Sequence, residues 1–337
     1  MRKKGLLLAA GAGALLTGRA LVRRINQYDF RSRVVLITGG SRGLGLVLAR
    51  ELAREGARLA LCARDEEELL RARDDLISRG AEAFIVACDV TDRAQVEEMV
   101  ISVQDHYGQI DVLINNAGVI EVGPMEVMTQ RDYEDEMKTH FWGPLYATLA
   151  VLPEMRRKRE GRIVNISSIG GKISVPHLLP YSASKFALVG LSEGLRAELA
   201  KDGIVVTTVC PGLMRTGSPM NADFKGQHRA EYAWFVISDS LPLASMSAER
   251  AARQIIAATK RGDAEVVLSV QAKIAALFHG IFPGLTADIL GVVNQLLPKA
   301  GGIGTERAKG KESQTDLTQS WLTALTEKAA RENNEVH

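Results

Sequence analysis

The sequence contains few of the residues that form disulfide frameworks or metal centres. Among its 337 residues are three cysteines, Cys62, Cys88 and Cys210, whose spacing matches no metal-binding motif. Their number is odd and each lies at the end of an apolar run, so we predict reduced thiols in the core and a cytoplasmic setting. The six histidines are scattered, with no pair at ligand spacing, which argues against metal chemistry.

A strong overall charge is also missing. The formal net charge is +2, and a composition that is 46% apolar and 24% charged is typical of a folded globular protein. A chain of this length can bury one large core and still have extensions at both ends. The charge is uneven, however, because residues 1–33 hold eight Lys or Arg and one acid, a balance of +7 that leaves −5 for the rest.

This basic arm, residues 1–32, contains an uncharged apolar stretch from Gly5 to Gly18. It lacks interleaved aromatic residues, so we predict no nucleic-acid binding. A signal peptide fits poorly because arginines follow where a cleavage site is expected, and fourteen residues are short for a membrane-spanning helix. We favour a segment that lies in a membrane surface on the cytoplasmic side, its cations facing anionic lipid. The alternative is an extra helix packed on the core.

From Arg33 onward, short apolar runs alternate with amphipathic stretches. Strands that are apolar throughout and alternate with helices indicate a parallel sheet covered on both faces. Seven such runs lie between Arg33 and Val270. We therefore predict an α/β fold: a Rossmann-type doubly wound parallel sheet of about seven strands, in a single domain over residues 33–270, with N- and C-terminal helical extensions.

Three segments interrupt or follow this alternation. Residues 213–241 have no clean period and are interpreted as a lid over a site. Residues 271–298 form an apolar helical extension that could pack on the core, pair with a second copy or help the arm contact lipid. Residues 299–337 form a polar tail that begins as a flexible linker and ends in a weak helix near Trp321.

The first predicted strand ends in a glycine-rich turn, "TGGSRGLG", which opens the first helix. Glycines allow the backbone to turn tightly and approach a ligand, and a helix N-terminus offers free N–H groups to a pyrophosphate. In this strand–turn–helix context the motif predicts a dinucleotide site. The predicted cofactor-binding residues of the turn are Gly39, Ser41, Arg42, Gly43, Leu44 and Gly45.

The end of the second strand indicates which dinucleotide is bound. NAD-binding proteins usually place an acid there to hold the ribose 2′-hydroxyl, but this chain has Arg64, and Asp65 fits a helix N-cap. Together with Arg42 in the turn, Arg64 would bind a 2′-phosphate well. We therefore predict NADP(H) as the cofactor, the alternative being two solvated surface arginines.

Tyr181 and Lys185 stand four residues apart on a predicted helix, so they share one face. A phenol has a pKa near ~10 and is a poor base at neutral pH, but a nearby cation favours the phenolate. Lowering the pKa by roughly three units requires about 4 kcal/mol, which Lys185 and a positively charged nicotinamide ring could supply in a partly dry cleft. Tyr181 is thus the predicted proton donor or acceptor, and Lys185 tunes it.

These motifs together resemble the short-chain dehydrogenases/reductases over residues 33–270. The turn is similar to the family's TGxxxGxG loop, "CDV" to its adenine-contacting turn and "NNAG" to its fourth-strand motif. The resemblance implies a nicotinamide cofactor bound in part by Asp89, Val90, Asn116, Ala117 and Gly118, together with Tyr181 and Lys185.

The resemblance also assigns roles around the substrate. Ser168, thirteen residues before Tyr181, corresponds to the serine that holds the substrate oxygen, whereas Ser167 is interpreted as a turn cap. Pro211, Gly212 and Thr216 correspond to the loop that binds the nicotinamide carboxamide. One position departs from the family: His140 stands where an asparagine usually anchors a proton relay. His140 either replaces that asparagine, and affects Lys185 if protonated, or is merely tolerated.

The resulting hypothesis is an NADP(H)-dependent oxidoreductase that interconverts a carbonyl and an alcohol, with reduction as the expected direction. The alternative is a catalytically silent NADP(H)-binding redox sensor or membrane scaffold. Because the lid is rich in large apolar residues, a lipophilic substrate is expected if they border the pocket, although they could instead pack the lid onto the core. These residues are Met214, Met220, Phe224, Tyr232, Trp234 and Phe235. The resemblance also implies a homo-oligomer.

Overall fold

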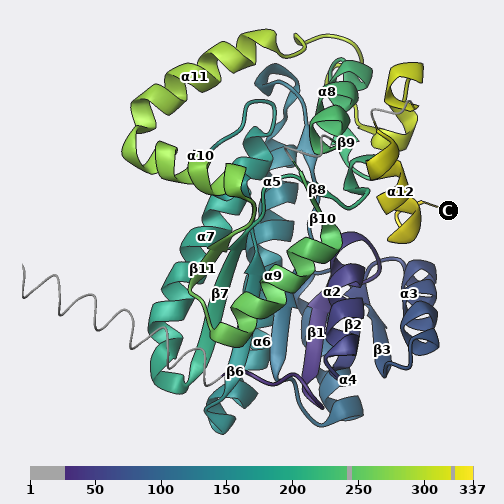
Figure 1. Cartoon of the computed structure of the whole chain (residues 1–337), viewed down its shortest axis with the longest axis vertical. Coiled ribbons are helices and arrows are strands. Elements are labelled where there is room, and N and C mark those ends of the chain that lie inside the picture. Colours follow the sequence, from purple (N-terminus) through teal and green to yellow (C-terminus); the bar gives the residue numbers. More distant parts are fainter. Residues whose placement is uncertain (1–26, 241–244, 320–322, 337) are drawn as a thin grey trace, which may run out of the picture.

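The computed structural model describes residues 27–240, 245–319 and 323–336 (Figure 1). Its centre is a sheet of seven parallel strands in the order β11-β7-β6-β4-β1-β2-β3. The strands are β1 (Val34–Thr38), β2 (Arg58–Ala63), β3 (Ala83–Ala87), β4 (Val112–Asn115), β6 (Gly161–Ile166), β7 (Ile204–Cys210) and β11 (Glu265–Val267). The predicted doubly wound sheet of seven strands is confirmed.

Helices cover both faces of the sheet, as the apolar strands require. On one face, a hydrophobic cluster joins the strands to α2 (Gly43–Arg54), α3 (Glu66–Ser78) and α9 (Ala248–Arg261). On the other face, a second cluster joins them to α4 (Arg93–Tyr107), α6 (Gly143–Lys158) and α7 (Leu179–Leu199). The three cysteines are buried and free, as predicted.

The strand order reverses between β1 and β4, because the chain runs from β1 outward to β3 and then returns to the other side of β1. In open parallel sheets, such a reversal leaves a crevice at the carboxyl ends of the two strands, where ligands bind. Here these ends carry the glycine turn after Thr38 and the "NNAG" motif that begins at Asn115.

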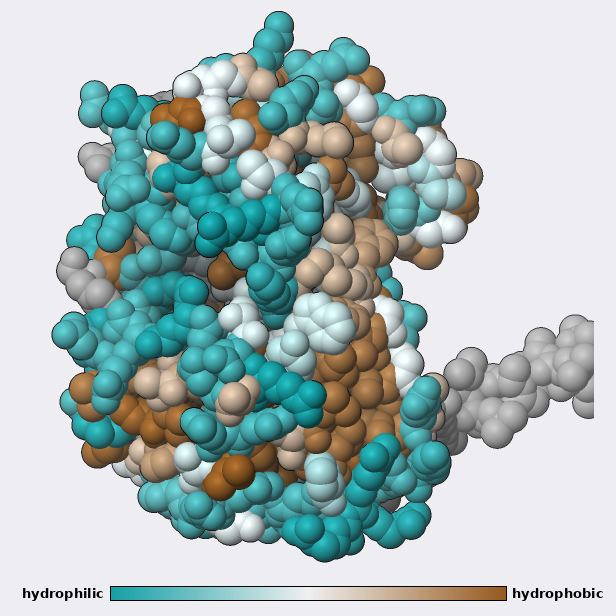
Figure 2. Space-filling view, turned by 180° about the vertical axis from the view of Figure 1, so that it is seen from behind, coloured by the Kyte–Doolittle hydropathy of each residue, from teal (hydrophilic) through white to brown (hydrophobic). Residues whose placement is uncertain are grey.

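The view from the side of α6 and α7 shows a broad apolar area (Figure 2). Exposed apolar side chains on these helices include Leu149 on α6 and Phe186 on α7. Exposed apolar areas of this kind often mark protein–protein contacts. The homo-oligomer stays a prediction, and this area is a surface on which it could form.

The lid region is more regular than its sequence indicates. It contains β8 (Met214–Arg215), β9 (Asp223–Phe224) and α8 (His228–Ser240), and β10 (Met246–Ser247) follows it. The side chains of Phe224, Tyr232 and Phe235 are buried together in a third hydrophobic cluster, which also includes Val122 of β5 (Glu121–Val122). These aromatic residues therefore pack the lid onto the domain.

The segments after the domain are also ordered. Helices α10 (Val270–Ile281) and α11 (Pro283–Leu296) follow the domain and diverge from a shared corner (Figure 1), and β12 (Ala308–Lys309) pairs antiparallel with β9. The polar stretch after Pro298, for which the sequence indicates a flexible linker, thus lies against the lid. Near Trp321 the described helix is α12 (Ala324–Glu332). The remaining helices are α5 (Gln130–Met137), a π-helical turn (Lys138–Trp142) and 3-10 turns at Met125–Val127, Ile169–Gly171, Ala200–Asp202, Ser218–Met220, Gly310–Glu312 and Asp316–Gln319.

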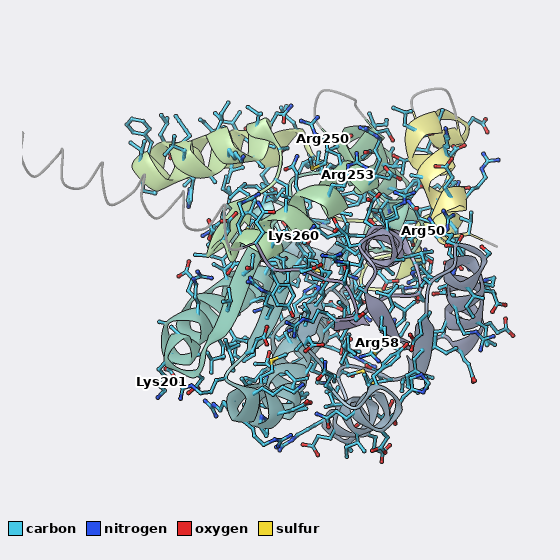
Figure 3. The ribbon with its side chains drawn as sticks, turned by 60° about the horizontal axis from the view of Figure 1, so that its bottom comes forward. Arg50, Arg58, Lys201, Arg250, Arg253 and Lys260 are labelled. Atoms are coloured by element: carbon cyan, nitrogen blue, oxygen red, sulfur yellow. The ribbon has the colours of Figure 1, made fainter. Side chains whose placement is uncertain are left out.

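Side chains from the domain hold α12 in place. Arg50 of α2 points toward the end of α12 (Figure 3) and donates to the carbonyl oxygen of Glu332 at 3.0 Å and to Asn333 Oδ1 at 3.2 Å. Gly217, in the lid, has a φ of 94° and touches the backbone of Ala330 so closely that a Cβ atom there would overlap it. The absence of a side chain at Gly217 thus permits α12 to approach the lid.

Within the described ranges, no helix combines the length and the apolar character needed to cross a bilayer. The predicted membrane segment, Gly5 to Gly18, lies outside the described residues.

Candidate active site

The glycine turn between β1 and α2 is packed against the end of β4. Gly39 has a φ of 64°, and a Cβ atom there would come within 2.8 Å of Ala117 Cα. A Cβ atom on Gly45 would overlap the carbonyl oxygen of Gly39. Neither position can hold a larger residue without moving the backbone. The first turn of α2 has no acidic residue and no side-chain cap, which leaves its N-terminus suited to an anion.

A cleft of about 990 Å³ runs from this turn to Tyr181 and Lys185. Most of the predicted site residues line it. They are Gly39, Ser41, Arg42, Gly43, Leu44, Arg64, Asp89, Val90, Asn116, Ala117, Gly118, His140, Tyr181, Lys185 and Thr216. Four predicted residues do not line the cleft: Gly45 and Ser168, which adjoin the lining residues Leu44 and Ser167, and Pro211 and Gly212. The cleft therefore joins both ends of the predicted site.

The two arginines predicted to hold a 2′-phosphate differ in their surroundings. Arg64 is exposed at the end of β2. Arg42 is paired with two carboxylates, with Nη1 2.6 Å from Glu68 Oε1 and Nε 3.4 Å from Glu335 Oε2. Ser41 donates to the same Glu68 at 3.0 Å. Both arginines border the cleft, but Arg42 must change partners before it can bind a phosphate.

Tyr181 and Lys185 lie on the first turns of α7, which has a proline, Pro180, among its first residues. The Lys185 ammonium is 5.6 Å from the centre of the Tyr181 ring and donates to the carbonyl oxygen of Ile166 at 3.1 Å. Ser168 is close to the Tyr181 side chain, and its hydroxyl accepts from the Gly170 N–H at 3.0 Å. Ser167, interpreted as a turn cap, instead donates to the carbonyl oxygen of Lys185.

Burial changes the acidity of both groups. It raises the pKa of Tyr181 to about 12, against the smaller opposing effect of the Ser168 hydrogen bond. It lowers the pKa of Lys185 to about 8, although the nearby Glu136 favours the charged form. Burial of the phenol thus opposes the lowering of its pKa by Lys185 and the nicotinamide ring, which stays a prediction.

His140 is fully buried in the π-helical turn that connects α5 to α6. Its Nε2 accepts from the Val119 N–H at 3.2 Å, so the ring proton lies on Nδ1. Nδ1 is 2.9 Å from Glu136 Oε2 and 2.8 Å from Ser184 Oγ. Burial, and then the charge of Lys185, hold the pKa of His140 well below its usual range. His140 is thus a neutral side chain between Glu136 and Val119, and it does not carry the positive charge considered above.

The family model described as short chain dehydrogenase matches residues 33–227. The chain belongs to the short-chain dehydrogenase/reductase family.

Relatives of this dehydrogenase/reductase come from bacteria and animals. It is 43% identical over 185 residues to the granaticin polyketide synthase putative ketoacyl reductase 1 of Streptomyces violaceoruber, covering 54% of this chain and 68% of the relative. It is 36% identical over 257 residues to a dehydrogenase/reductase SDR family protein 7-like of Anopheles gambiae, covering 74% and 79%. A solved structure of actinorhodin polyketide ketoreductase with NADPH superposes with a TM-score of 0.63 at 34% identity, covering 70% of this chain and 95% of that one.

Sequence reasoning missed several residues of this dehydrogenase/reductase that line the cleft. Glu136 precedes His140 by one helical turn, a spacing that could have indicated a pair. Three further lining residues come from the polar tail: Arg307, Lys309 and Glu335. No motif or periodicity in the sequence around them indicates a site. Of the six large apolar lid residues, Met214 lines the cleft, and the buried aromatic rings lie inside the lid.

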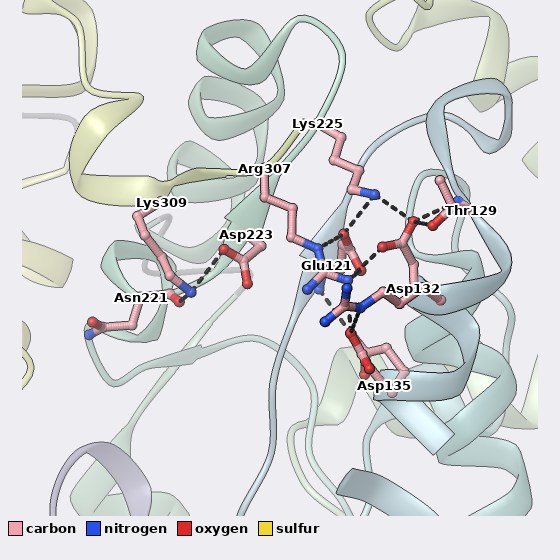
Figure 4. A network of polar contacts seen from close by, with 11 residues as sticks. Glu121, Thr129, Asp132, Asp135, Asn221, Asp223, Lys225, Arg307 and Lys309 are labelled. Carbon is pink, nitrogen blue, oxygen red and sulfur yellow. Dashed lines mark hydrogen bonds and ion pairs between the residues drawn. The ribbon is translucent and has the colours of Figure 1, made fainter. Parts of the chain in front are cut away.

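A network of charges fixes the tail beside the cleft (Figure 4). Arg307 Nε is 3.0 Å from Glu121 Oε1, and its Nη2 is 2.6 Å from Asp132 Oδ1 and 3.1 Å from Asp135 Oδ2. The buried Lys225 ammonium also contacts Glu121 and Asp132, at 3.2 and 2.5 Å. Asp132 and Glu121 are buried and each contacts both cations, so removing one cation would leave two buried carboxylates to share the other. Residues around Arg307 are thus firmly attached.

We predict that His140→Asn makes the protein less stable at pH 7.5 than the wild type, and that this difference shrinks at pH 5.5. The folded state holds His140 neutral, whereas the unfolded chain binds a proton there below pH ~6.5. The wild type should therefore lose about 1.4 kcal/mol of stability by pH 5.5 that the asparagine variant does not lose. Urea unfolding at both pH values measures the difference. An equal gap at the two values would show that His140 is not held neutral.

Proposed function

We propose that this chain is an NADP(H)-dependent oxidoreductase that reduces a carbonyl group to an alcohol with Ser168, Tyr181 and Lys185. The observation that carries the proposal is that one cleft joins the glycine turn to the partly buried Tyr181 and the buried Lys185. The relatives named as ketoacyl reductases support carbonyl reduction as the direction.

The residues at the strand ends fit a dinucleotide. The turn offers close backbone approach at Gly39 and Gly45, and α2 presents its N-terminus. Asp89 also lines the cleft, and its side chain accepts from the Thr91 N–H at 2.9 Å in the turn after β3. Thr216 lines the cleft from the lid side and is proposed to bind a carboxamide. A bound nicotinamide supplies the hydride.

The protein's own groups handle the proton. We assign the Tyr181 hydroxyl as the donor to the substrate oxygen, because its high pKa keeps it protonated at neutral pH. We assign Ser168, which is close to Tyr181, to hold the same substrate oxygen. Lys185, with a pKa of about 8, can return a proton to the phenolate in the physiological range. His140 accepts from the Val119 N–H and contacts Glu136. These contacts fix the position of Val119 and of the π-helical turn.

Tyr181→Phe tests the proton donor. We expect it to lower the rate of carbonyl-dependent NADPH oxidation by a factor on the order of 1,000, since general acids contribute about that much. NADPH affinity, measured by the fluorescence of the bound cofactor, should stay unchanged. Tyr133→Phe, which removes a hydroxyl from α5, serves as the matched control. Activity that survives in Tyr181→Phe would overturn the assignment. A wild type that binds NADPH and reduces no carbonyl in a broad panel would favour a silent sensor.

NADPH is proposed over NADH because Arg64 stands where NAD-binding proteins usually have an acid. The solved relative with NADPH is consistent with this choice. Ser41 and Arg42 border the same corner, although Glu68 and Glu335 engage them in this structure. Arg64 is therefore the side chain on which the preference should depend most.

We predict that Arg64→Asp weakens NADPH binding by about tenfold or more, because it removes a charge-assisted hydrogen bond and introduces repulsion. NADH binding should change little. Arg73→Asp, on the exposed side of α3, makes the same change in net charge away from the cleft. Titrations of the three proteins with both cofactors give the comparison, and equal losses for NADPH and NADH would count against the 2′-phosphate site.

We also propose a lipophilic substrate, and the support for it comes from the exposed surface of α10 and α11, which lies outside the cleft. Helices α10 and α11 expose a row of large apolar side chains, with Lys273 and Asp288 as their charged residues. The exposed residues are Val270, Ile274, Leu277, Ile281, Phe282, Leu285, Ile289, Val292, Val293 and Leu296. A surface of this composition suits a membrane interface, which would concentrate apolar carbonyl compounds. If the full chain fails to float with anionic phospholipid vesicles at low salt, this proposal is wrong.

A further inference from the structure

The last described residues of the chain lie on the glycine turn. The Gly43 N–H donates to the carbonyl oxygen of Asn333 at 2.9 Å. Asn334 Nδ2 donates to the carbonyl oxygens of Ser41 at 2.9 Å and Glu68 at 3.1 Å, and its Oδ1 accepts from Arg71 at 3.1 Å. The backbone amide that such a turn offers to a phosphate is therefore already bonded within the chain.

Glu335 brings a carboxylate to the same place. Its side chain is buried against Gly43, where a Cβ atom on the glycine would overlap Glu335 Oε1. Its Oε2 lies 3.4 Å from Arg42 Nε and accepts from Asn221 Nδ2 at 2.6 Å. An acidic group beside a helix N-terminus and an arginine has the partners that a phosphate of a dinucleotide would use.

We infer that residues 333–335 are a built-in competitor for the phosphates of the cofactor, and that they must leave the glycine turn before the cofactor can bind. This inference rests on the proposed dinucleotide site. Glu335 and a phosphate cannot share the turn, because the Glu335 side chain occupies the space at Gly43. The affinity for the cofactor then reflects the fraction of molecules in which the end of the chain is released.

The attachment of the tail suits such a release. Arg307 and its carboxylates anchor the tail well before residues 333–335 in the sequence, and Ala330 packs against Gly217. Beyond Glu332 the chain is not helical, and Asn334 has a φ of 60°, a conformation that most residues adopt at a cost. Residues 333–336 can therefore detach while α12 and the segment around Arg307 stay in place.

The release should respond to pH. Burial raises the pKa of Glu335 to about 7, against the opposing charge of Arg42 and the Asn221 hydrogen bond, and the acidic Glu68 on α3 adds to the rise. A released Glu335 would have an ordinary pKa near ~4.3. The docked tail thus prefers a protonated Glu335, so docking weakens as the pH rises toward and through 7. Cofactor binding to the full chain should tighten over the same range.

NADPH affinities of full-length variants test the inference, with bound-cofactor fluorescence at pH 6 and pH 8 as the measurement. Asn334→Ala removes three side-chain hydrogen bonds and disfavours the positive φ, so it should bind NADPH about tenfold more tightly than wild type at pH 6. Asn294→Ala, an exposed asparagine on α11, is the matched control and should bind like wild type. Glu335→Gln mimics the protonated acid, so its affinity should stay weak at both pH values.

A second readout follows the tail directly. The N–H groups of Asn333 and Glu335 bond to the carbonyl oxygens of Ala329 and Ala330. Saturating NADPH should speed their hydrogen exchange in the wild type, and Glu332→Gln, an exposed neighbour, should behave the same. If Asn334→Ala binds NADPH no better than wild type and exchange at these amides is unchanged or slower, the tail does not compete. If no variant binds NADPH or NADH at all, the proposed cofactor itself is wrong.

Discussion

Burial of a phenol and an ammonium on one face of α7 is the constraint on which the proposed chemistry depends. Removal from water raises the pKa of Tyr181 to about 12 and lowers that of Lys185 to about 8. At neutral pH, the two pKa shifts leave Tyr181 protonated and a fraction of Lys185 neutral, and both side chains line the same part of the cleft. A donor to a carbonyl oxygen needs its proton in place before the reaction, and burial ensures this. The same burial makes the phenolate costly unless a further positive charge arrives.

The opposite end of the cleft depends on backbone approach. Because Gly39 and Gly45 have no side chains, the turn packs closely against Ala117 and against its own backbone. A dinucleotide could therefore lie directly on the backbone of the turn. The surprising feature is that the end of the chain uses this surface. Asn333 and Glu335 place a carbonyl and a carboxylate where we propose that phosphate oxygens bind, so in this proposal the tail and the cofactor compete for Gly43 and Arg42.

The sequence predicted those parts of the molecule whose signals are local. The seven apolar runs, the glycine turn and the Tyr181–Lys185 spacing each depend on residues within one strand, turn or helix, and the structure places them in one fold and one cleft. Conversely, Asn334 contacts Ser41 across 293 positions, and Arg307 reaches Asp132 across 175. Such pairs leave no periodic pattern in the sequence, which therefore indicates a flexible linker where the structure has an attached tail. The neutral state of His140 likewise depends on burial, which comes from the tertiary structure.

The most direct test of this account is the ionisation of Tyr181, followed by ultraviolet difference titration of the wild type against Tyr181→Phe. Without cofactor, the tyrosine signal that differs between the two proteins should titrate near pH 12. With saturating NADP⁺, whose ring is positively charged, it should titrate at a clearly lower pH. A Tyr181 that ionises at the same pH with and without NADP⁺ would contradict the claim that the cofactor's charge and Lys185 together make this buried phenol a usable acid and base.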